Sequence, residues 1–401
     1  MAVNQGGRHY WFAENLKKQG YEPVIFCANT FHCERKPIDL GTKKHKIELV
    51  NGIPFVYVKT IPALGNNFKR ILNMALFYRN LFHVTKDYVK KNGKPDVIIA
   101  SSVHPLTMVA GIQIAKKLGI PCICEVRDLW PESLVAYGII SRNSLIAKLL
   151  YRGEKWIYKK ADAVVMTWEG GKDYIVERGW DNEITIEKVK HIPNGVVLDS
   201  FDKNCLDYPI NDSDLDDEDY CNVVYAGSIR KVNNLGILLD AAKIIWEQGH
   251  TKIRFLIYGS GNETEMLIRR CEEEKIDNVK FKGRVDKKFV PSILTQADVN
   301  VLHNSSTSLD KFGQSQNKLF EYLAAGKCIV QTYSTGYSVC DRYECGISAS
   351  EQTAEKIAQV VIEACTNREK SQAMGINARK ASYDFDFAKL TEQLIDVIES
   401  V

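Results

Sequence analysis

The chain has 401 residues, of which 45% are hydrophobic and 26% are charged. This length and balance predict a soluble globular protein with two domains. No apolar run reaches the stretch of about 18 residues that a membrane-spanning helix needs, and the first residues do not form a signal peptide, so we expect a cytoplasmic protein.

The cysteines do not indicate a metal or redox site. Eleven are scattered through both halves, several of them inside apolar strand-like runs. Cys122 and Cys124 lack the spacing of a zinc or redox pair, and Cys340 and Cys345 have no second pair nearby. We interpret them as reduced, buried thiols and expect no metal.

Positive charge is concentrated in the first half. Residues 1–200 contain 29 Lys and Arg against 19 Asp and Glu, a net charge of +10, whereas residues 201–401 contain 24 against 31, a net charge of −7. A basic half favours an anionic surface or a phosphate-bearing acceptor as partner. Nucleic acid would also suit this charge, but no nucleic-acid-binding motif is present, so we expect no such partner.

The N-terminus contains a glycine pair that runs into a helix. Gly6 and Gly7 precede a predicted helix at residues 10–19, and only five residues precede the pair. In an α/β domain such a pair normally follows a strand, so the first strand is expected to be missing or cut short. Strands are predicted next at residues 22–28 and 55–59.

A long basic amphipathic helix is predicted at residues 64–91. Its apolar residues are interleaved with Lys69, Arg70, Arg79 and further lysines. Such a helix can lie on an anionic bilayer, with its cations at the headgroups and its Leu and aromatic side chains in the interface. The alternative is a helix that packs on the core and exposes a solvated basic face.

The rest of the chain alternates strands and helices. Strands are predicted at residues 96–102, 121–126, 163–167, 189–193, 222–226, 254–258, 279–282, 298–302 and 328–332, and helices at 106–118, 144–160, 171–179, 235–248, 263–275, 287–296, 353–365, 370–382 and 387–400. This order of near-continuous apolar strands indicates parallel sheets covered on both faces. Residues 204–219 are acidic and aperiodic, which indicates a linker or exposed loop. The predicted fold is therefore α/β, with two Rossmann-like domains at residues 1–200 and 221–384 and a linker at 201–220.

The stretch 313–327, GQSQNKLFEYLAAGK, predicts a helix with a small polar loop at its start and a stop at Gly326. Unpaired backbone N–H groups and the helix dipole make such a start an anion site, which suits a phosphate or diphosphate. Glu321, about one turn into the helix, could then reach the hydroxyls of the molecule that carries the phosphate.

Three more loops follow strands at the carboxyl edge of the second sheet, where open α/β sheets bind ligands. Glycine lets the backbone of such a loop come close to a ligand, and cations suit phosphates. Together the four loops predict a diphosphate pocket with Arg230 and Lys231 as cations, although either could equally be a solvated loop residue. The three loops read Gly227-Ser-Ile-Arg230-Lys231, Gly259-Ser-Gly261-Asn262 and Gly283-Arg284-Val285.

The first half supplies candidate catalytic groups. Asp128 and Glu132 stand in a loop with Trp and Pro at the end of a predicted strand, where a carboxylate could orient or deprotonate an acceptor hydroxyl. The structural alternative is that Glu125 or Asp128 caps the next helix or pairs with Arg127. His104 is a weaker candidate, for which a surface or capping role is favoured.

The order of these motifs resembles a known family. Gly227-Ser-Ile-Arg230, Gly259-Ser-Gly261, Phe281-Lys-Gly283-Arg284-Val285 and Asn317-Lys-Leu-Phe-Glu321-Tyr with Ala325-Gly326-Lys327 are similar to the nucleotide-sugar half of GT-B retaining glycosyltransferases of family 4, of the bacterial polysaccharide-building type. Gly6-Gly7-Arg8, residues 125–132 and His191-Ile-Pro193-Asn194-Gly195-Val196 match the acceptor-side glycine loop, a characteristic N-domain segment and the interdomain signature. The resemblance covers essentially the whole chain. It implies two Rossmann-like domains facing a central cleft, with the C-terminal helix at 385–401 joining the first.

The resemblance also implies an activity. The chain would be a retaining, metal-independent hexosyltransferase that needs no cofactor and moves a sugar from a nucleoside-diphosphate donor, expected to be a UDP-sugar, to a lipid-linked or polysaccharide acceptor. The helix at 64–91 would dock it on the inner face of the plasma membrane. Asp128, Glu132 and Arg230 would act at the reacting centre, where positive charge stabilises the departing diphosphate.

The donor site follows from the same resemblance. The diphosphate would be held by Arg230, Lys231 and the backbone amides of Gln314, Ser315 and Asn317, the ribose by Glu321, and the base near Arg284 and Val285. Gly227 and Gly259 would admit the donor closely, and Gly6 and Gly7 would approach it from the acceptor side.

Two departures from the family pattern leave alternatives open, and the short N-terminus is one of them. The family pairs two glutamates with seven residues between them, but Gly313 stands where the first would precede Glu321. A nucleotide-sugar epimerase of the same fold and a non-catalytic nucleotide-sugar-binding protein are therefore the alternative functions. Asp212, Asp214 and Asp216 superficially match the DxD motif of metal-dependent transferases, but they lie in the acidic segment, for which a solvated loop is predicted.

Overall fold

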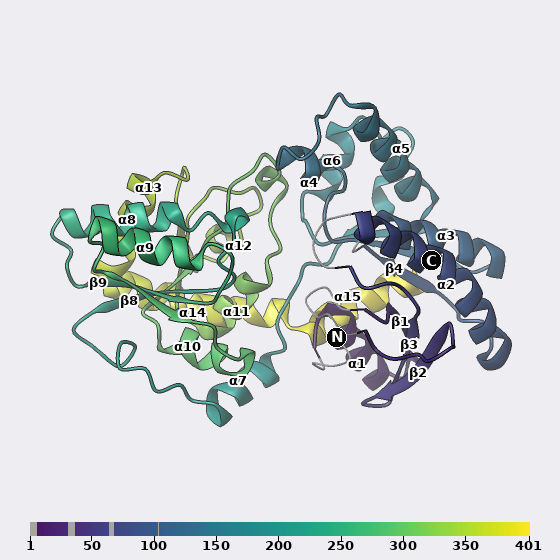
Figure 1. The fold of residues 1–401 in the computed structure, drawn as a ribbon, viewed down its shortest axis with the longest axis horizontal. Coiled ribbons are helices and arrows are strands. Elements are labelled where there is room, and N and C mark those ends of the chain that lie inside the picture. The colour runs from purple at the N-terminus through teal and green to yellow at the C-terminus, as the bar shows by residue number, and fades with distance from the viewer. Residues whose placement is uncertain (1–5, 31–36, 64–67, 103) are drawn as a thin grey trace. The chain divides into compact units, whose positions relative to one another are not determined.

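The computed structural model describes residues 6–30, 37–63, 68–102 and 104–401 (Figure 1). The chain divides into two compact units, Met1–Pro193 with Leu390–Val401, and Asn194–Lys389. Each unit is an α/β structure built on parallel strands, which confirms the predicted fold class. The predicted loss of a first strand concerns residues 1–5, which lie outside the described residues, as do residues 64–67 of the predicted basic helix.

The first unit contains a four-stranded parallel sheet in the order β4-β5-β6-β7 and a three-stranded sheet in the order β1-β3-β2. Its strand β2 has no counterpart among the predicted strands, because its sequence HKIELV buries no residue and shows no clean alternation. The strands are β1 (Ile25–Ala28), β2 (His45–Val50), β3 (Ile53–Val58), β4 (Ile98–Ser101), β5 (Cys122–Val126), β6 (Ala163–Met166) and β7 (Val189–His191). The helices are α1 (Arg8–Lys18), α2 (Phe68–Asn92), α3 (Pro105–Leu118), α4 (Glu132–Ala136), α5 (Leu145–Lys160) and α6 (Gly171–Glu177).

The second unit is built on a six-stranded parallel sheet in the order β10-β9-β8-β11-β12-β13. Its strands are β8 (Cys221–Ala226), β9 (Ile253–Tyr258), β10 (Val279–Gly283), β11 (Val299–Leu302), β12 (Cys328–Gln331) and β13 (Gly346–Ser348). Its helices are α7 (Leu198–Asp207), α8 (Gly236–Glu247), α9 (Thr264–Glu274), α10 (Val290–Gln296), α11 (Asn317–Ala325), α12 (Val339–Arg342), α13 (Ala354–Thr366) and α14 (Arg368–Ser382). The last helix, α15 (Phe387–Glu399), begins in this unit, and its residues from Leu390 on belong to the first.

Alternate residues of the second sheet enter two separate cores. Val223, Phe255 and Ile257 pack with α8 and α13 on one face, whereas Val224 and Leu256 pack with α10 and α11 on the other (Figure 1). All six residues of β9 are buried. A parallel strand covered on both faces is apolar along most of its length, which explains why the strands of this unit could be predicted from the sequence; Arg254 is the charged exception in β9.

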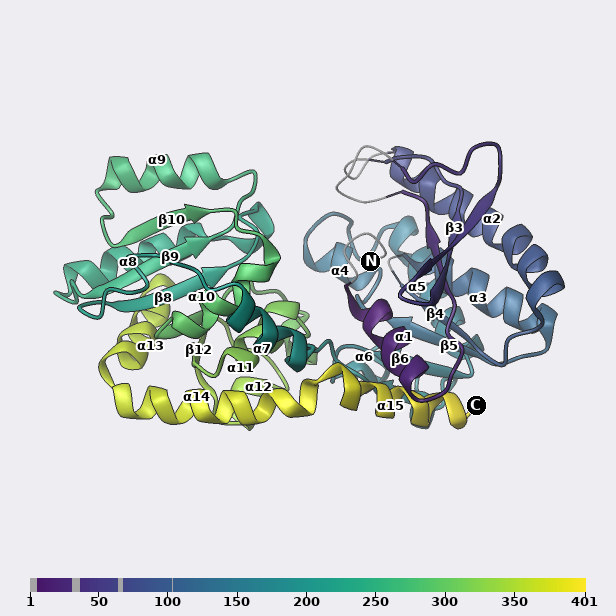
Figure 2. The same cartoon turned by 90° about the horizontal axis from the view of Figure 1, so that it is seen from below.

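In the first unit α3 contacts both α2 and α5 (Figure 2). The buried face of α2 consists of Asn73, Phe77, Leu81 and Val84, so the middle of this helix packs on the core as one of the two interpretations requires. Within the described residues, no helix is both long enough and apolar enough to cross a bilayer.

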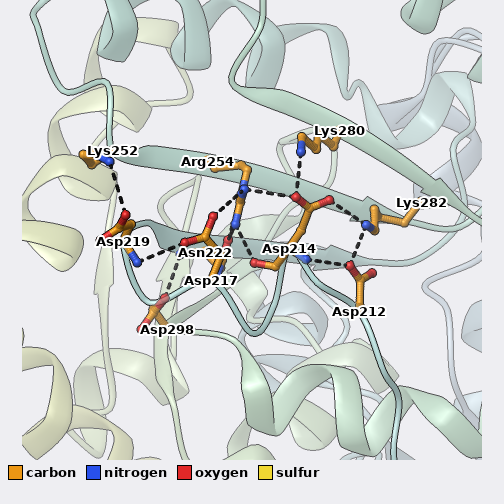
Figure 3. Close-up of polar contacts among 10 residues, drawn as sticks. All are labelled: Asp212, Asp214, Asp217, Asp219, Asn222, Lys252, Arg254, Lys280, Lys282 and Asp298. Atoms are coloured by element: carbon orange, nitrogen blue, oxygen red, sulfur yellow. Dashed lines mark hydrogen bonds and ion pairs between the residues drawn. The ribbon is translucent and has the colours of Figure 1, made fainter.

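The acidic segment is packed onto the second unit, which corrects its interpretation as a linker at 201–220. Helix α7 forms its first part, and Leu215 is buried in the core. Lys282 donates to Asp212 and Asp214, and Lys280 donates to Asp214 at 2.6 Å (Figure 3). These lysines lie on β10, so cations from the sheet edge neutralise the aspartates and hold the segment in place.

Arg254 is the innermost cation of this cluster. It lies on β9, its side chain is only 6% exposed, and it pairs with Asp214 at 3.0 Å and with Asp217 at 3.6 Å (Figure 3). It also donates to the side chain of Asn222. Hydrogen bonds and nearby lysines lower the pKa of Asp214 to about 2, although its partial burial acts in the opposite direction. The match to a DxD motif therefore reflects a structural ion-pair cluster.

Replacing Asp214 should test this cluster. The substitution Asp214→Asn leaves the buried Arg254 guanidinium without its main carboxylate, so we expect the free energy of unfolding to fall by about 2 to 3 kcal/mol. Urea denaturation measures the change. The control Asp216→Asn removes a neighbouring exposed carboxylate and should change stability little; equal effects of the two substitutions would contradict the structural role.

Candidate functional site

In the second unit, loops at the carboxyl edge of the sheet contact one another through backbone. The Gly227 N–H donates to the carbonyl of Tyr258, and the Gly259 N–H donates to that of Gly283. A Cβ on Gly259 would lie 1.8 Å from the Gly227 oxygen. A Cβ on Gly261 would come equally close to a carbonyl of the first loop, that of Ile229. These glycines are therefore required first of all for the loops to approach each other.

The stretch 313–327 contains the predicted helix. Helix α11 begins at Asn317 and ends at Ala325, and Gly326 adopts the left-handed conformation that ends it. Gly313 also has a positive φ of 89°, and its N–H donates to the carbonyl of Asp310. The predicted loop, helix and stop are confirmed.

Side chains at the start of α11 are held by protein partners. Gln314 donates to buried Asp310 at 2.6 Å and accepts from the Tyr333 hydroxyl at 2.9 Å. The Ser315 hydroxyl accepts the backbone N–H of Asn194 at 2.7 Å. Gln314, Gln316 and Tyr333 line a small hollow beside this loop. The loop is thus held in a defined shape by amides, hydroxyls and the buried carboxylate of Asp310.

Glu321 remains accessible on the next turn of α11. Its side chain is 25% exposed, and its carboxylate lies 3.5 Å from the Nζ atom of the exposed Lys287. The hydrophobic neighbours of Glu321 along the helix, Phe320 and Leu323, are buried in the core. The helix therefore presents one carboxylate outward from a fixed backbone.

The other predicted donor residues lie on the surface of the same edge. Arg230, Lys231 and Arg284 are exposed, and Val285 packs partly on the core. None of the three cations forms an ion pair within the described residues. Their long side chains are free to move toward an anion, and the structure does not assign a contact to them.

Lys318 is a cation of this edge that sequence reasoning missed. Its Nζ atom lies 3.2 Å from the Tyr225 hydroxyl and 3.1 Å from the carbonyl of His303, and it stands over the Tyr225 ring. A Cβ on Gly227 would lie 3.2 Å from the Lys318 Cδ atom. Burial lowers the pKa of Lys318 to about 8, because no carboxylate pairs with it within the described residues.

In the first unit, Glu125 organises the residues after the glycine pair. It is buried at the end of β5 and accepts from Arg8 at 2.7 Å and from Ser101 at 2.6 Å, while His9 lies 2.8 Å away. Burial alone would raise the pKa of Glu125, but Arg8 and His9 hold it well below its usual range. Arg8 also donates to the carbonyl of Ile192.

This arrangement fixes the start of α1 and leaves one group accessible. Gly7 caps the helix with a φ of 105°, a conformation that favours glycine. The His9 side chain is 22% exposed, whereas that of Glu125 is 4% exposed. A histidine oriented by a buried carboxylate is a recurrent arrangement for positioning or deprotonating a hydroxyl. The pairing was not predictable because residues 9 and 125 are far apart in sequence.

The three predicted groups of this unit have different environments. Asp128 is exposed. Glu132 is buried, accepts the Tyr151 hydroxyl at 2.6 Å and pairs with Arg142, so both of its oxygens are held by protein partners. His104 is also buried, which corrects its predicted surface role; burial lowers its pKa to about 4, and its Nδ1 atom has no hydrogen-bond partner within the described residues.

A second buried carboxylate adjoins Glu132. Glu154 accepts the hydroxyls of Tyr158 at 2.7 Å and Tyr174 at 2.8 Å. Burial raises the pKa of Glu154 to about 8, although these hydrogen bonds oppose the shift. The guanidinium of Arg178 lies over the Tyr151 ring, 3.7 Å from its centroid, and 3.9 Å from a Glu132 oxygen, and its charge opposes the raised pKa of Glu154.

The described residues contain no group of three or more His, Cys, Asp or Glu side chains placed to hold a metal ion. The polar groups of the second unit's edge are instead cations, amides and one carboxylate. This set suits a phosphate-bearing ligand with hydroxyls.

Comparison with protein families defines the class. Residues 6–195 match the model of the glycosyl transferase 4-like domain, and residues 210–381 match that of glycosyl transferases group 1. The two matches together span most of the chain. The chain belongs to the GT-B glycosyltransferases, and it is an enzyme of this class.

Individual relatives are distant. The probable glycosyltransferase WbjE of Pseudomonas aeruginosa is 21% identical over 235 residues, which are 55% of this chain and 54% of that protein, so the match spans about half the length of the relative. The sucrose-phosphate synthase of Thermosynechococcus elongatus has a similar structure, with a TM-score of 0.73, 18% identity and coverage of 98% of this chain and 93% of the other. HepE of Anabaena in complex with UDP-glucose has a TM-score of 0.60, 15% identity and 87% coverage of both chains.

The buried Glu154 predicts a pH dependence of stability. Its folded pKa of about 8 lies above the ordinary value of 4.5, so the folded state binds its proton more tightly and loses stability as pH rises from about 4.5 to about 8. Glu154→Gln should remove this component. Thermal melts across this range measure it, with the exposed Glu187→Gln as control; parallel pH profiles of wild type and Glu154→Gln would refute the assignment.

Proposed function

We propose that the protein transfers a sugar, with retention, from a nucleoside-diphosphate donor to a lipid-linked or polysaccharide acceptor in bacterial surface polysaccharide synthesis. The observation that carries the donor class is the edge of the second unit, where a desolvated lysine, neutral amides and the accessible Glu321 stand together. The similar structure of HepE with UDP-glucose supports a UDP-sugar. The acceptor class and the biological role rest on the sequence resemblance.

The donor diphosphate is bound by the cations of the second unit. Arg230 and Lys231 reach it from the loop after β8, and Lys318 meets it from α11. The backbone amides of residues 314–317 supply further donors, and Glu321 binds the ribose hydroxyls. Arg284 and Val285 flank the base. Lys318 is suited to this role because a partly buried cation without a carboxylate partner gains from an incoming anion.

The reaction breaks the bond between the anomeric carbon and the diphosphate oxygen, and the bonding electron pair leaves with the nucleoside diphosphate. An acceptor hydroxyl forms the new bond on the same face, and its proton passes to a base. Stabilising the negative charge of the departing diphosphate lowers the barrier most, so Arg230 and Lys318 are the main catalytic cations. No step in this scheme uses a metal ion.

The acceptor hydroxyl is oriented by the first unit. Asp128 is exposed at the end of β5, and His9 is held by Glu125 next to Gly6 and Gly7. Either can take the proton. Glu132, whose oxygens are bound by Tyr151 and Arg142, supports the loop from below and does not contact the acceptor in this scheme.

The protein acts at the inner face of the plasma membrane. The first turns of α2 expose Phe68, Ile71 and Leu72, with exposed fractions of 76%, 63% and 41%, next to Lys69 and Arg70. An apolar and basic helix start of this kind suits an anionic membrane surface, while the rest of α2 packs on α3. This location brings the site close to a lipid-linked acceptor.

Transfer is distinguished from the alternative functions by its products. Thermal-shift screening of nucleotide sugars identifies the donor, because a ligand that binds only the folded state raises the midpoint. With that donor, release of nucleoside diphosphate that requires an acceptor supports transfer. Isomerised donor without acceptor would indicate an epimerase, and tight binding without turnover across acceptors would indicate a binding protein.

Glu321 should be essential for donor use. Replacing it by Ala removes hydrogen bonds from a charged acceptor to the ribose, so we expect kcat/KM to fall on the order of a hundredfold or more. Initial-rate assays with the identified donor measure the loss. The control Glu355→Ala changes an exposed carboxylate on α13 and should leave the rate unchanged; unchanged transfer by Glu321→Ala would remove the ribose role.

Lys318 should take up a proton when the diphosphate binds. At about pH 8.5 it is partly neutral, and a bound anion raises its pKa. Calorimetric titration with UDP in two buffers of different ionisation enthalpy should therefore show proton uptake. The substitution Lys318→Met should abolish this uptake and weaken the affinity for UDP by about tenfold or more.

The variant Lys318→Arg provides the matched control. Arginine stays protonated at this pH, so this variant should bind UDP without proton uptake. Wild-type binding with no proton uptake would show that the diphosphate does not reach Lys318, while leaving the donor class intact.

A further inference from the structure

A second apolar and basic surface lies at the start of α5, outside the donor and acceptor groups described above. The segment 133–153 contains Arg142, Lys148 and Arg152 and no Asp or Glu. Five large apolar side chains in it are exposed, and we call them, with Lys148 and Arg152, the α4–α5 surface. They are Tyr137 (49%), Ile139 (65%), Leu145 (84%), Ile146 (63%) and Leu149 (68%).

These exposures are not explained by the packing of α5. The helix buries Ala147, Tyr151, Ile157 and Tyr158 toward the core, so its inner face is complete. The outward face of a surface helix is normally polar. Leu145 is nonetheless the most exposed large hydrophobic side chain among the described residues. Exposed apolar groups gathered in this way mark a contact surface.

The charged residues of the α4–α5 surface indicate which class of partner it binds. The cations Lys148 and Arg152 flank the apolar side chains on the same helix, and no acid interrupts the segment. Short apolar side chains can enter the interface of a bilayer while neighbouring cations meet anionic headgroups. The composition therefore fits an anionic lipid surface.

The topology places this surface on the same edge as the start of α2. Helix α3 connects the parallel strands β4 and β5, and the segment with α4 and α5 connects β5 and β6, so α3 and α5 begin toward the carboxyl edge of these strands. Helix α2 follows β3, and its start lies on the same side as that of α3 (Figure 2). α3 contacts both of the others (Figure 2). Its own first turn exposes Leu106 by 37%. The apolar starts of α2 and α5 therefore flank that of α3 on one edge of the first unit.

We propose that the α4–α5 surface is a docking site for an anionic lipid bilayer and acts together with the exposed start of α2. The proposal deepens the membrane location given under the proposed function and rests on it for the biological setting. Leu145, Ile146 and Leu149 enter the interface, and Lys148 and Arg152 bind the headgroups. Two contact points on one edge orient the first unit on the membrane, which a single helix cannot do.

Co-sedimentation of the full chain with vesicles tests the proposal. Vesicles of phosphatidylcholine with phosphatidylglycerol should bind the protein, and vesicles of phosphatidylcholine alone should bind it much less. The double variant Leu145→Ser with Leu149→Ser keeps every charge and should lower the partition coefficient on the order of tenfold or more. The variant Lys148→Glu with Arg152→Glu should abolish the preference for anionic vesicles.

A matched control uses another exposed leucine. Leu206 on α7 is 82% exposed and lies in the second unit, so Leu206→Ser should not change vesicle binding. All these side chains are exposed, and unchanged circular dichroism spectra and UDP binding verify that the variants are folded.

Four outcomes would overturn the proposal. Unchanged vesicle binding by the double leucine variant is the first. Equal binding to neutral and anionic vesicles is the second. The third is a dimer in solution that the leucine variant dissociates without losing vesicle binding, since the surface would then be an interface between two copies. Loss of binding only on removing charge from Lys69, Arg70 and Arg79 would leave docking by α2 in place and refute the α4–α5 surface.

Discussion

Close contact between backbone loops at the carboxyl edge of the six-stranded sheet is the constraint on which the donor side depends. Parallel strands end at one edge, so the loops after β8 and β9 must share a small space. They do so because Gly259 and Gly261 bring backbone against the carbonyls of Gly227 and Ile229. Side chains at these positions would force the loops apart. Lys318 of α11 packs against Gly227, so the position of α11 relative to the loops would change as well.

Buried and partly buried charged side chains are either matched by an opposite charge or left beside neutral groups. In the first unit, the buried Glu125 is matched by Arg8 and His9, and the buried Glu132 by Arg142, so these charges hold loops in position. In the second unit, Lys318 is desolvated beside neutral oxygen atoms only. A charged side chain paired with an opposite charge holds the structure in place. A partly buried cation without a carboxylate partner can instead gain one by binding an anionic ligand.

Local pattern made most elements predictable, and distant contacts decided the rest. Strands such as β9 are buried on both faces and read as continuous apolar runs, and α11 was predicted together with its stop at Gly326. β2 was missed because it lies exposed and has no regular alternation. The acidic segment was misread because its partners on β9 and β10 follow about 40 to 70 residues later. The lowered pKa of Lys318 and the burial of Glu132 likewise depend on tertiary neighbours, which periodicity does not show.

The glycine in place of the family's first glutamate is more than a lost carboxylate. Gly313 has a φ of 89° and donates its N–H to the carbonyl of Asp310, a conformation that a glutamate would adopt only with strain. The polar side chains that follow it are Gln314 and Gln316, which are held with Tyr333 around a small hollow, and Gln314 also donates to Asp310. Neutral amides donate and accept hydrogen bonds where a carboxylate only accepts, so this loop offers a ligand a different set of hydrogen-bonding groups from those of a glutamate.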